Sequence, residues 1–212
     1  MTTRVYLARH GKTVSTDEDR FAGETDVALS EMGRSDARAL GVRLEAQPIT
    51  AFYASPLQRA LDTARLVAQP HGQDVVPRSE LREMSHGRWE AKTRAEVQRL
   101  YAEEYARWES DPFSFAPEGG ETGLAVTARA LPALLEIVAA HPRESVLIVS
   151  HKATIRLLIC AVLGLDGRNY RERLDQGPGC LNILEFRDAA RARLTLFNDT
   201  SHCGTFEESK VV

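Results

Sequence analysis

The chain has 212 residues, of which 43% are hydrophobic and 27% are charged, and its formal net charge is −3. The apolar content is enough for the core of a single domain, which we expect to span residues 1–212. No excess of basic residues is present to attract nucleic acid, so polyanion binding is excluded as a first interpretation.

The first half of the chain alternates apolar runs with helical patterns. A strand is predicted near residues 4–9, followed by a helix that Ser30 caps and that stops before Pro48. A second strand covers residues 51–54. Ser55 then reads as the N-cap of another helix, with Pro56 at its first position.

The second half continues the alternation. We expect a short strand at residues 74–77, helices at 93–109 and 121–140, and a strand at 145–150. The helix at 121–140 should be kinked by Pro132. A helix at residues 153–163 ends at Gly164, and strands near 180–186 and 192–198 can pair as a hairpin. The alternation predicts an α/β fold with a largely parallel sheet.

Unusual polar residues follow each of the predicted parallel strands. Arg9 and His10 follow the first strand, Arg59 lies one turn into the helix after the second, Glu83 follows the third and His151 follows the fourth. Ligands in such sheets bind at the carboxyl ends of the strands, so these side chains should converge there.

Two arginines, two histidines and a glutamate suit phosphoryl transfer. Arg9 and Arg59 can hold a phosphate dianion with paired donors. A neutral His10 can attack phosphorus to form a phosphohistidine, while His151 donates to the equatorial oxygens. Glu83, kept protonated by the nearby dianion, can protonate the leaving oxygen and later deprotonate water. This scheme requires no metal.

In four segments the chain resembles the histidine phosphatase superfamily, whose fold is phosphoglycerate-mutase-like. These segments are Leu7–Thr13, Ser55–Ala64, Leu81–Glu90 and Val149–Arg156. The stretches Phe21–Asp26 and Leu29–Gly33 also resemble the family's substrate loop and the helix behind it.

The resemblance implies a three-layer α/β/α sandwich with a helical lid inserted at about residues 88–122. It makes His10 the nucleophile, Glu83 the proton donor, and Arg9, Arg59 and His151 the phosphate pocket. The substrate would also meet Thr13, Phe21, Gly23 and Lys152. The implied partner is a small phosphorylated metabolite, with no cofactor.

The chain departs from the family pattern at two places in the sequence. Lys152 stands where the family usually has glycine, which puts a cation beside the pocket and can favour an anionic substrate; it can equally be a solvated helix-end lysine. Ser85 and His86 replace the aromatic or small residue that often precedes the glycine. These changes leave the substrate open while keeping the chemistry.

Three functions compete. A phosphatase is favoured over a cofactor-dependent phosphoglycerate mutase, because Met84–Gly87 does not match the mutase segment and the following insertion is short. A non-catalytic phosphate-binding regulator is the third reading, but such proteins usually lose a catalytic residue. The loop Pro117–Thr122 resembles one at the pocket rim of the family's phosphatases.

Several residues have simpler interpretations. A lone histidine at a strand end is more often structural than catalytic, and only the matched set reverses that expectation. Trp89 and Trp108 are expected in core or lid packing, and the remaining histidines as structural or surface residues: His71, His86, His141 and His202. Cys160, Cys180 and Cys203 are odd in number and widely spaced, which favours reduced, mostly buried thiols.

The start of the chain leads directly into a strand, and no apolar run approaches a membrane span. We therefore expect a cytoplasmic protein without a membrane partner, and a homodimer is left open.

Overall fold

The computed structural model describes residues 2–14 and 20–204, which build a six-stranded sheet in the order β3-β2-β4-β1-β5-β6. The strands are β1 (Thr3–Arg9), β2 (Ile49–Ala54), β3 (Val75–Pro77), β4 (Ser145–Ser150), β5 (Leu181–Asp188) and β6 (Arg191–Asp199). The strands β3, β2, β4 and β1 pair with their neighbours in parallel. β5 is antiparallel to β1, and β6 is antiparallel to β5. The predicted mostly parallel sheet and its terminal hairpin are confirmed.

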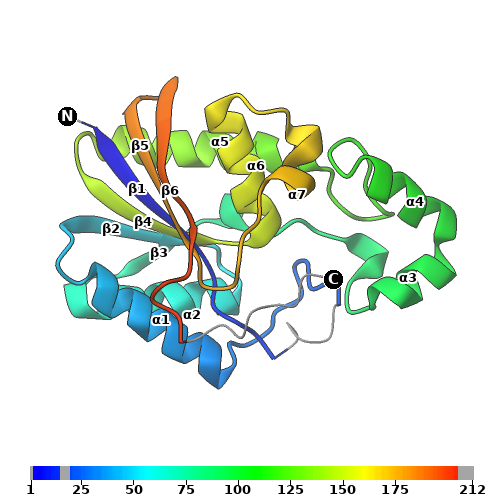
Figure 1. Cartoon of the computed structure of the whole chain (residues 1–212), viewed down its shortest axis with the longest axis horizontal. Helices are drawn as coiled ribbons and strands as arrows, with labels where there is room; N and C mark the ends of the chain where they lie inside the picture. The colour runs from blue at the N-terminus through cyan, green and yellow to red at the C-terminus, as the bar shows by residue number, and fades with distance from the viewer. Residues whose placement is uncertain (1, 15–19, 205–212) are drawn as a thin grey trace.

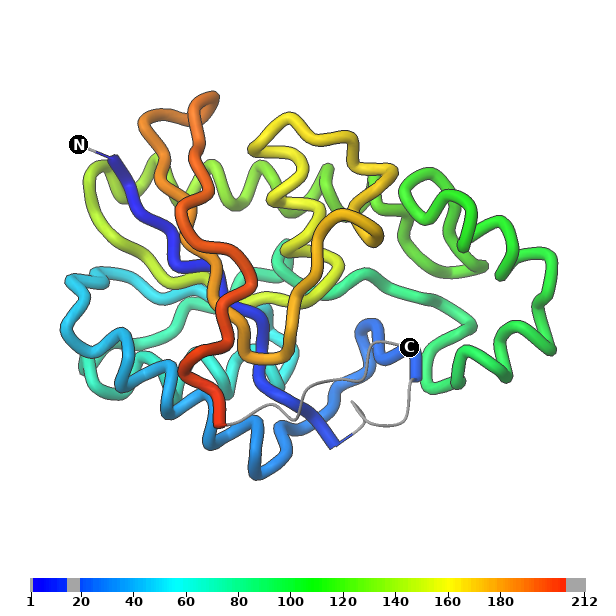
Figure 2. Tube along the Cα trace, viewed as in Figure 1, coloured from blue at the N-terminus to red at the C-terminus, as the bar shows by residue number. Residues whose placement is uncertain are grey.

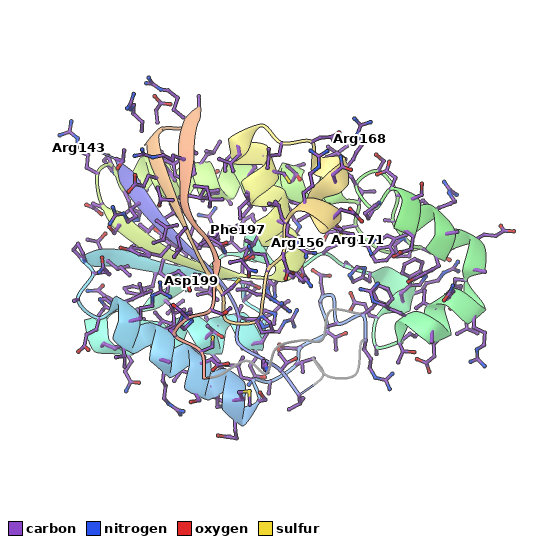
Figure 3. The ribbon with its side chains drawn as sticks, viewed as in Figure 1. Arg143, Arg156, Arg168, Arg171, Phe197 and Asp199 are labelled. Carbon is purple, nitrogen blue, oxygen red and sulfur yellow. The ribbon has the colours of Figure 1, made fainter. Side chains whose placement is uncertain are left out.

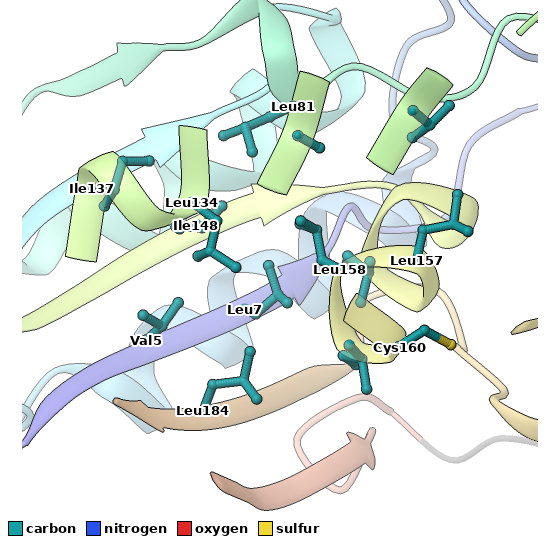
Figure 4. Close-up of a cluster of buried hydrophobic side chains, with 14 of the residues drawn as sticks. Val5, Leu7, Leu81, Leu134, Ile137, Ile148, Leu157, Leu158, Cys160 and Leu184 are labelled. Atoms are coloured by element: carbon teal, nitrogen blue, oxygen red, sulfur yellow. The ribbon is translucent and has the colours of Figure 1, made fainter. Parts of the chain in front are cut away.

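Helices cover both faces of the sheet (Figure 1). One face carries α1 (Glu31–Leu44) and α2 (Gln58–Ala68), and the other carries α5 (Gly123–Ala140) and α6 (Lys152–Leu163). The strands alternate between the two cores: Val5 and Leu7 face α5 and α6, while Tyr6 and Ala8 face α1 and α2 (Figure 4). The expected three-layer sandwich is confirmed.

The segment between Glu83 and α5 lies beside the sandwich, to the right in Figures 1 and 2. It contains a 3₁₀ helix (Gly87–Trp89), α3 (Arg94–Leu100) and α4 (Ala102–Ser110). We predicted one helix over 93–109, but the backbone breaks at Tyr101, where φ is −137°. The turn lets both helices direct side chains into one small cluster, formed by Phe21, Trp89, Val97 and Trp108. We refer to this cluster as the aromatic cluster and to residues 88–122 as the lid.

The helix after β2 starts later than the sequence suggested. Its N-cap is Leu57, not Ser55, and Pro56 precedes the helix. The Ser55 hydroxyl is fully buried, where it accepts a hydrogen bond from the Leu57 N–H and hydrogen-bonds with His151. Ser55 therefore serves the strand-end cluster instead of capping the helix. The predicted cap at Ser30 and the left-handed helix end at Gly164 are both confirmed.

Among the described residues there is one helix, α5, whose length and apolar composition alone would allow it to cross a membrane. The sequence analysis identified no such run. In the fold, α5 continues through Pro132 and buries Val126, Leu134 and Ile137 against the sheet, so its apolar character is that of a core helix.

Candidate active site

A cavity of about 400 Å³ opens beside the carboxyl ends of β1 and β4. Four of the five predicted chemical groups line it: Arg9, His10, Arg59 and Glu83. The four predicted substrate contacts line it as well: Thr13, Phe21, Gly23 and Lys152. The fifth group, His151, lies behind the wall, fully buried, with its ring centroid 5.1 Å from that of His10.

The imidazole of His10 is held in one tautomer. Its Nδ1 lies 2.7 Å from the carbonyl oxygen of Gly11, and because a carbonyl only accepts, Nδ1 carries the proton. Nε2 therefore presents a lone pair, to which Arg59 Nε donates across 3.3 Å. Burial, followed by the charges of Arg9 and Arg59, lowers the pKa of His10 well below its usual value. His10 thus keeps a neutral, nucleophilic nitrogen at this point.

Glycine is required next to this histidine. A Cβ atom at Gly11 would lie 2.5 Å from the carbonyl oxygen of Gly33, at the first turn of α1. The close approach of the two backbones fixes the Gly11 carbonyl that holds His10 Nδ1. Sequence reasoning had quoted both glycines as motif residues without this role.

The guanidinium of Arg59 is fastened by backbone carbonyls of the loop at residues 23–25. Its Nη1 donates to Thr25 at 2.8 Å and its Nη2 donates to Gly23 at 2.7 Å. Burial lowers the pKa of Arg59, but an arginine remains charged near neutral pH. The loop at residues 23–25 therefore holds both Nη groups and leaves Nε directed at His10.

Glu90, to which we had assigned no role, organises that loop. Its carboxylate accepts from the N–H of Glu24 at 3.0 Å and from the Thr25 hydroxyl at 3.0 Å. It also accepts from the N–H of His86 at 3.1 Å. Gly23, at φ +49°, has no room for a side chain, because a Cβ atom would lie 2.2 Å from Glu90 Oε1. Glu90 thus ties the loop that holds Arg59 to the start of the lid.

Arg9 is positioned by the loop that precedes β5, the strand next to β1. Its Nη1 donates to the carbonyl of Gln176 at 2.7 Å, while its buried Nε has no hydrogen-bond partner within residues 2–14 and 20–204. The side chain of Gln176 is buried and donates to Asn182, which in turn donates to the Leu7 carbonyl. Burial lowers the pKa of Arg9. An unsatisfied buried donor beside a cavity is suited to an anionic ligand.

The carboxylate of Glu83 sits at the N-terminus of α6. It accepts from the N–H groups of Met84 at 2.9 Å, Ala153 at 3.2 Å and Thr154 at 3.3 Å. Arg129 of α5 donates to the carbonyls of residues 80, 82 and 83 and is itself held by Glu121. The loop that presents Glu83 is therefore fixed by two helices that pack on the sheet.

His151 contributes a second neutral imidazole. Its Nε2 and the Ser55 hydroxyl lie 2.7 Å apart, and its Nδ1 is buried without a partner in the described part of the chain. Burial, then the charge of Arg59, lowers the pKa of His151 well below its usual value. A protonated Nδ1 can donate to a phosphoryl oxygen.

His86, expected to be a structural or surface residue, packs its ring 4.8 Å from that of Phe21 and also lines the cavity, where burial lowers its pKa to about 4. One expectation about the lid is corrected. The loop Pro117–Thr122, expected at the rim, is not part of the cavity wall. It packs behind the wall, where Gly120 pairs with His86 and Glu121 accepts from the Ser85 N–H. Trp89 and Trp108 are buried in the aromatic cluster as expected, and Trp108 also reaches the cavity.

The cavity is strongly positive. Seven of its 19 lining residues are arginine or lysine, and one lining residue, Glu83, is acidic. Besides Arg9 and Arg59, the cations include Lys152, Arg156 and Arg171; the latter two are labelled in Figure 3. Of these three, Lys152 was predicted as a substrate contact, Arg156 was noted only as a motif residue, and Arg171 was not predicted. No group of three or more histidine, cysteine or acidic residues within the described residues could hold a metal ion. Cys160 and Cys180 are free and buried, and Cys203 is free and half-buried.

Comparison with known proteins identifies the family to which a site of this kind belongs. The family model described as "Histidine phosphatase superfamily (branch 1)" matches residues 5–200. Phosphoserine phosphatase 1 of Hydrogenobacter thermophilus is 31% identical over 207 residues, covering 96% of this chain and 95% of that protein. A glucosyl-3-phosphoglycerate phosphatase of Mycolicibacterium vanbaalenii is 34% identical, with 92% and 97% covered. Among solved structures, Bacillus stearothermophilus YhfR superimposes with a TM-score of 0.89 at 34% identity, covering 95% of this chain and 100% of that one.

Proposed function

The chain belongs to the histidine phosphatase superfamily and is a phosphatase of small phosphorylated metabolites, and from this premise we propose that it hydrolyses phosphomonoesters through a phosphoenzyme on His10. The observation that carries the proposal is the state of His10. Its proton is on Nδ1, its Nε2 lone pair faces a charged arginine, and its pKa is lowered, so the attacking atom is ready without a separate base.

In the first step, Nε2 of His10 attacks phosphorus while the bond from phosphorus to the ester oxygen breaks. The leaving oxygen takes a proton from the carboxyl group of Glu83. Arg9, Arg59 and His151 hold the three equatorial oxygens and stabilise the charge that develops on them.

In the second step, water attacks the phosphohistidine and the phosphorus–nitrogen bond breaks. The Glu83 carboxylate, left ionised by the first step, accepts the proton from water. Inorganic phosphate leaves, and His10 is again neutral, so the cycle balances without a further reactant.

Thr13, Phe21 and Gly23 serve the substrate in different ways. The Gly23 carbonyl orients Arg59, so it acts through the phosphate pocket. Thr13 and Phe21 form wall surface beside it. The alcohol half of the ester then lies toward the lid, where Phe21, His86 and Trp108 meet.

The proposal is tested by trapping the intermediate. The enzyme is mixed with a phosphorus-32-labelled ester, quenched without acid, digested and mapped, with the His10→Ala variant as control. The label should lie on the peptide that contains His10, and activity should persist in a strong chelator. A label on another residue, or complete loss of activity in the chelator, would contradict the proposal.

A further inference from the structure

The positive charge of the cavity exceeds what one phosphate needs. Arg9 and Arg59 flank His10, and they match the dianion of a phosphomonoester. Lys152, Arg156 and Arg171 line the same cavity but belong to α6 and to the short helix α7 (Tyr170–Arg173). Lys152 and Arg156 share one exposed carboxylate, that of Asp175, and Arg171 pairs with Glu109. Three cations thus face two acids here, and this excess of positive charge in the cavity wall favours a second anionic ligand group.

Two of these cations have donors without partners. The side chain of Arg156 is 10% exposed, and its buried Nε has no hydrogen-bond partner within the described residues. The same holds for Nη1 of Arg171. Arg171 is held in place from the lid, because its Nη2 donates to Glu109 at 2.9 Å and its guanidinium lies 4.1 Å from the Trp108 ring centroid. Arg156 is held in turn by Asp175, 3.1 Å from its Nη2, and Figure 3 labels both arginines.

A carboxylate of the chain already lies against this group. Oδ1 of Asp175 is 3.1 Å from Arg156 Nη2 and 3.8 Å from Lys152 Nζ. Its side chain is 73% exposed, so it contacts the cations from the solvent side. An exposed ion pair of this kind is weak and can be exchanged for another carboxylate.

We propose that Lys152, Arg156 and Arg171 form a second anion site, which binds a carboxylate on the alcohol half of the substrate and which Asp175 occupies in the unliganded enzyme. The site rests on the proposed function, because it selects among the phosphomonoesters that His10 attacks. Its preferred ligand is a carboxylate because that is the group the structure places there. Exchange of Asp175 for the substrate carboxylate keeps the cations paired in both states.

The test measures inhibition of p-nitrophenyl phosphate hydrolysis by matched phosphonates. Each pair has the same chain length and differs only in a terminal carboxylate or methyl group: phosphonoacetate with ethylphosphonate, 3-phosphonopropionate with propylphosphonate, and 4-phosphonobutyrate with butylphosphonate. At least one carboxylated member should bind about tenfold more tightly than its methyl partner, as one charged contact predicts. The three lengths sample the spacing between the two anion sites.

Three variants decide the assignment. Lys152→Met should reduce the carboxylate preference of the best pair several-fold, whereas Asp175→Asn should increase it by removing the internal competitor. Asp188→Asn is the matched control, because Asp188 is an exposed acid paired with Arg191 on the β5–β6 hairpin. This variant should prefer the carboxylated phosphonate to the same extent as the wild type.

Other results overturn the proposal. It fails if no carboxylated phosphonate binds better than its partner, or if Lys152→Met and Asp175→Asn shift the preference in the same direction or not at all. Absence of p-nitrophenyl phosphate turnover in the wild type would instead contradict the proposed function, so the two failures are distinguishable.

Discussion

Arg59 Nε donates to His10 Nε2 across 3.3 Å, so the arginine contacts the imidazole at its unprotonated nitrogen. In the mechanism that we propose, the lone pair that accepts this bond is the one that attacks phosphorus. When a phosphoryl group arrives, Arg59 must transfer this donor to a phosphoryl oxygen while its Nη groups stay on the carbonyls of residues 23 and 25. The bond therefore orients the nucleophile in the empty site and is replaced when the site fills.

Removal of the nucleophile or of its flanking arginine should abolish turnover. His10→Ala and Arg9→Ala are expected to lower kcat/KM by at least about a thousandfold, because each loses a group that acts on the transition state. Both should remain folded by circular dichroism, and the exposed Arg193→Ala should behave as wild type. Appreciable turnover by His10→Ala would remove this residue from the nucleophile role.

The Glu83→Gln variant should discriminate between leaving groups. An alkyl phosphate needs a proton on its leaving oxygen, whereas p-nitrophenolate leaves readily without one. We expect kcat/KM to fall far more for the alkyl ester than for p-nitrophenyl phosphate. Equal losses for both esters would exclude Glu83 as the acid.

Hydrolysis should exceed isomerisation. The chain lacks the mutase segment after Glu83, so the phosphohistidine should react with water rather than with a second acceptor. Incubation with 3-phosphoglycerate, with free phosphate and 2-phosphoglycerate followed together, should show phosphate release without stimulation by a bisphosphate. Efficient, bisphosphate-stimulated isomerisation would indicate a mutase instead.

Glu90 should act through Arg59. We expect Glu90→Ala to lower kcat/KM by about tenfold or more, because it releases the N–H of Glu24 and the Thr25 hydroxyl from the loop that aims Arg59. In a double-mutant cycle, the same change should cost much less in the Arg59→Ala background. Additive losses would show that Glu90 has no part in positioning the arginine.

The stability of the protein should fall in mild acid, and His86 should contribute to this. Burial lowers the pKa of His86 to about 4, so between its usual value of 6.5 and about 4 the unfolded chain binds a proton that the folded chain does not. The free energy of unfolding then decreases as pH falls, by up to about 1.4 kcal/mol per pH unit for this group.

Urea unfolding of the wild type and of His86→Phe, each at pH 7 and at about pH 5.5, measures the effect. The variant should lose less stability between the two pH values, because phenylalanine binds no proton in either state. A pH dependence identical in both proteins would contradict the contribution of His86.

The residues at the strand ends could be predicted from the sequence because the signal for them lies in a few adjacent residues. An apolar run of strand length followed by Arg9 and His10 places these residues at a sheet edge, and the helix signals at Ser30 and Gly164 are equally local. The same signals misplaced the start of α2, because the Ser55 hydroxyl is used by His151, 96 residues away.

The roles of Arg171, Asp175 and Glu90 could not be predicted for a similar reason, although Glu90 was noted as a motif residue. Each residue gains its role only from a partner that the fold brings near: Trp108, Lys152 and Thr25, respectively. Periodicity indicates which residues are buried but not which groups meet. The position of His86 in the cavity wall could be anticipated only because this residue departs from the family pattern.

The aromatic cluster packs separately from the two cores of the sandwich. Phe21, Trp89 and Trp108 thus stabilise the lid by contacts that the sheet does not share. Mutations of lid residues other than Glu90 and Glu121 can accumulate and reshape the wall that meets the alcohol half. Glu90 meanwhile keeps the loop that holds Arg59, and Glu121 keeps the arginine that fixes the Glu83 loop. This division allows a lineage of such enzymes to acquire new substrates by drift in one part of the chain, with the hydrolytic step inherited intact.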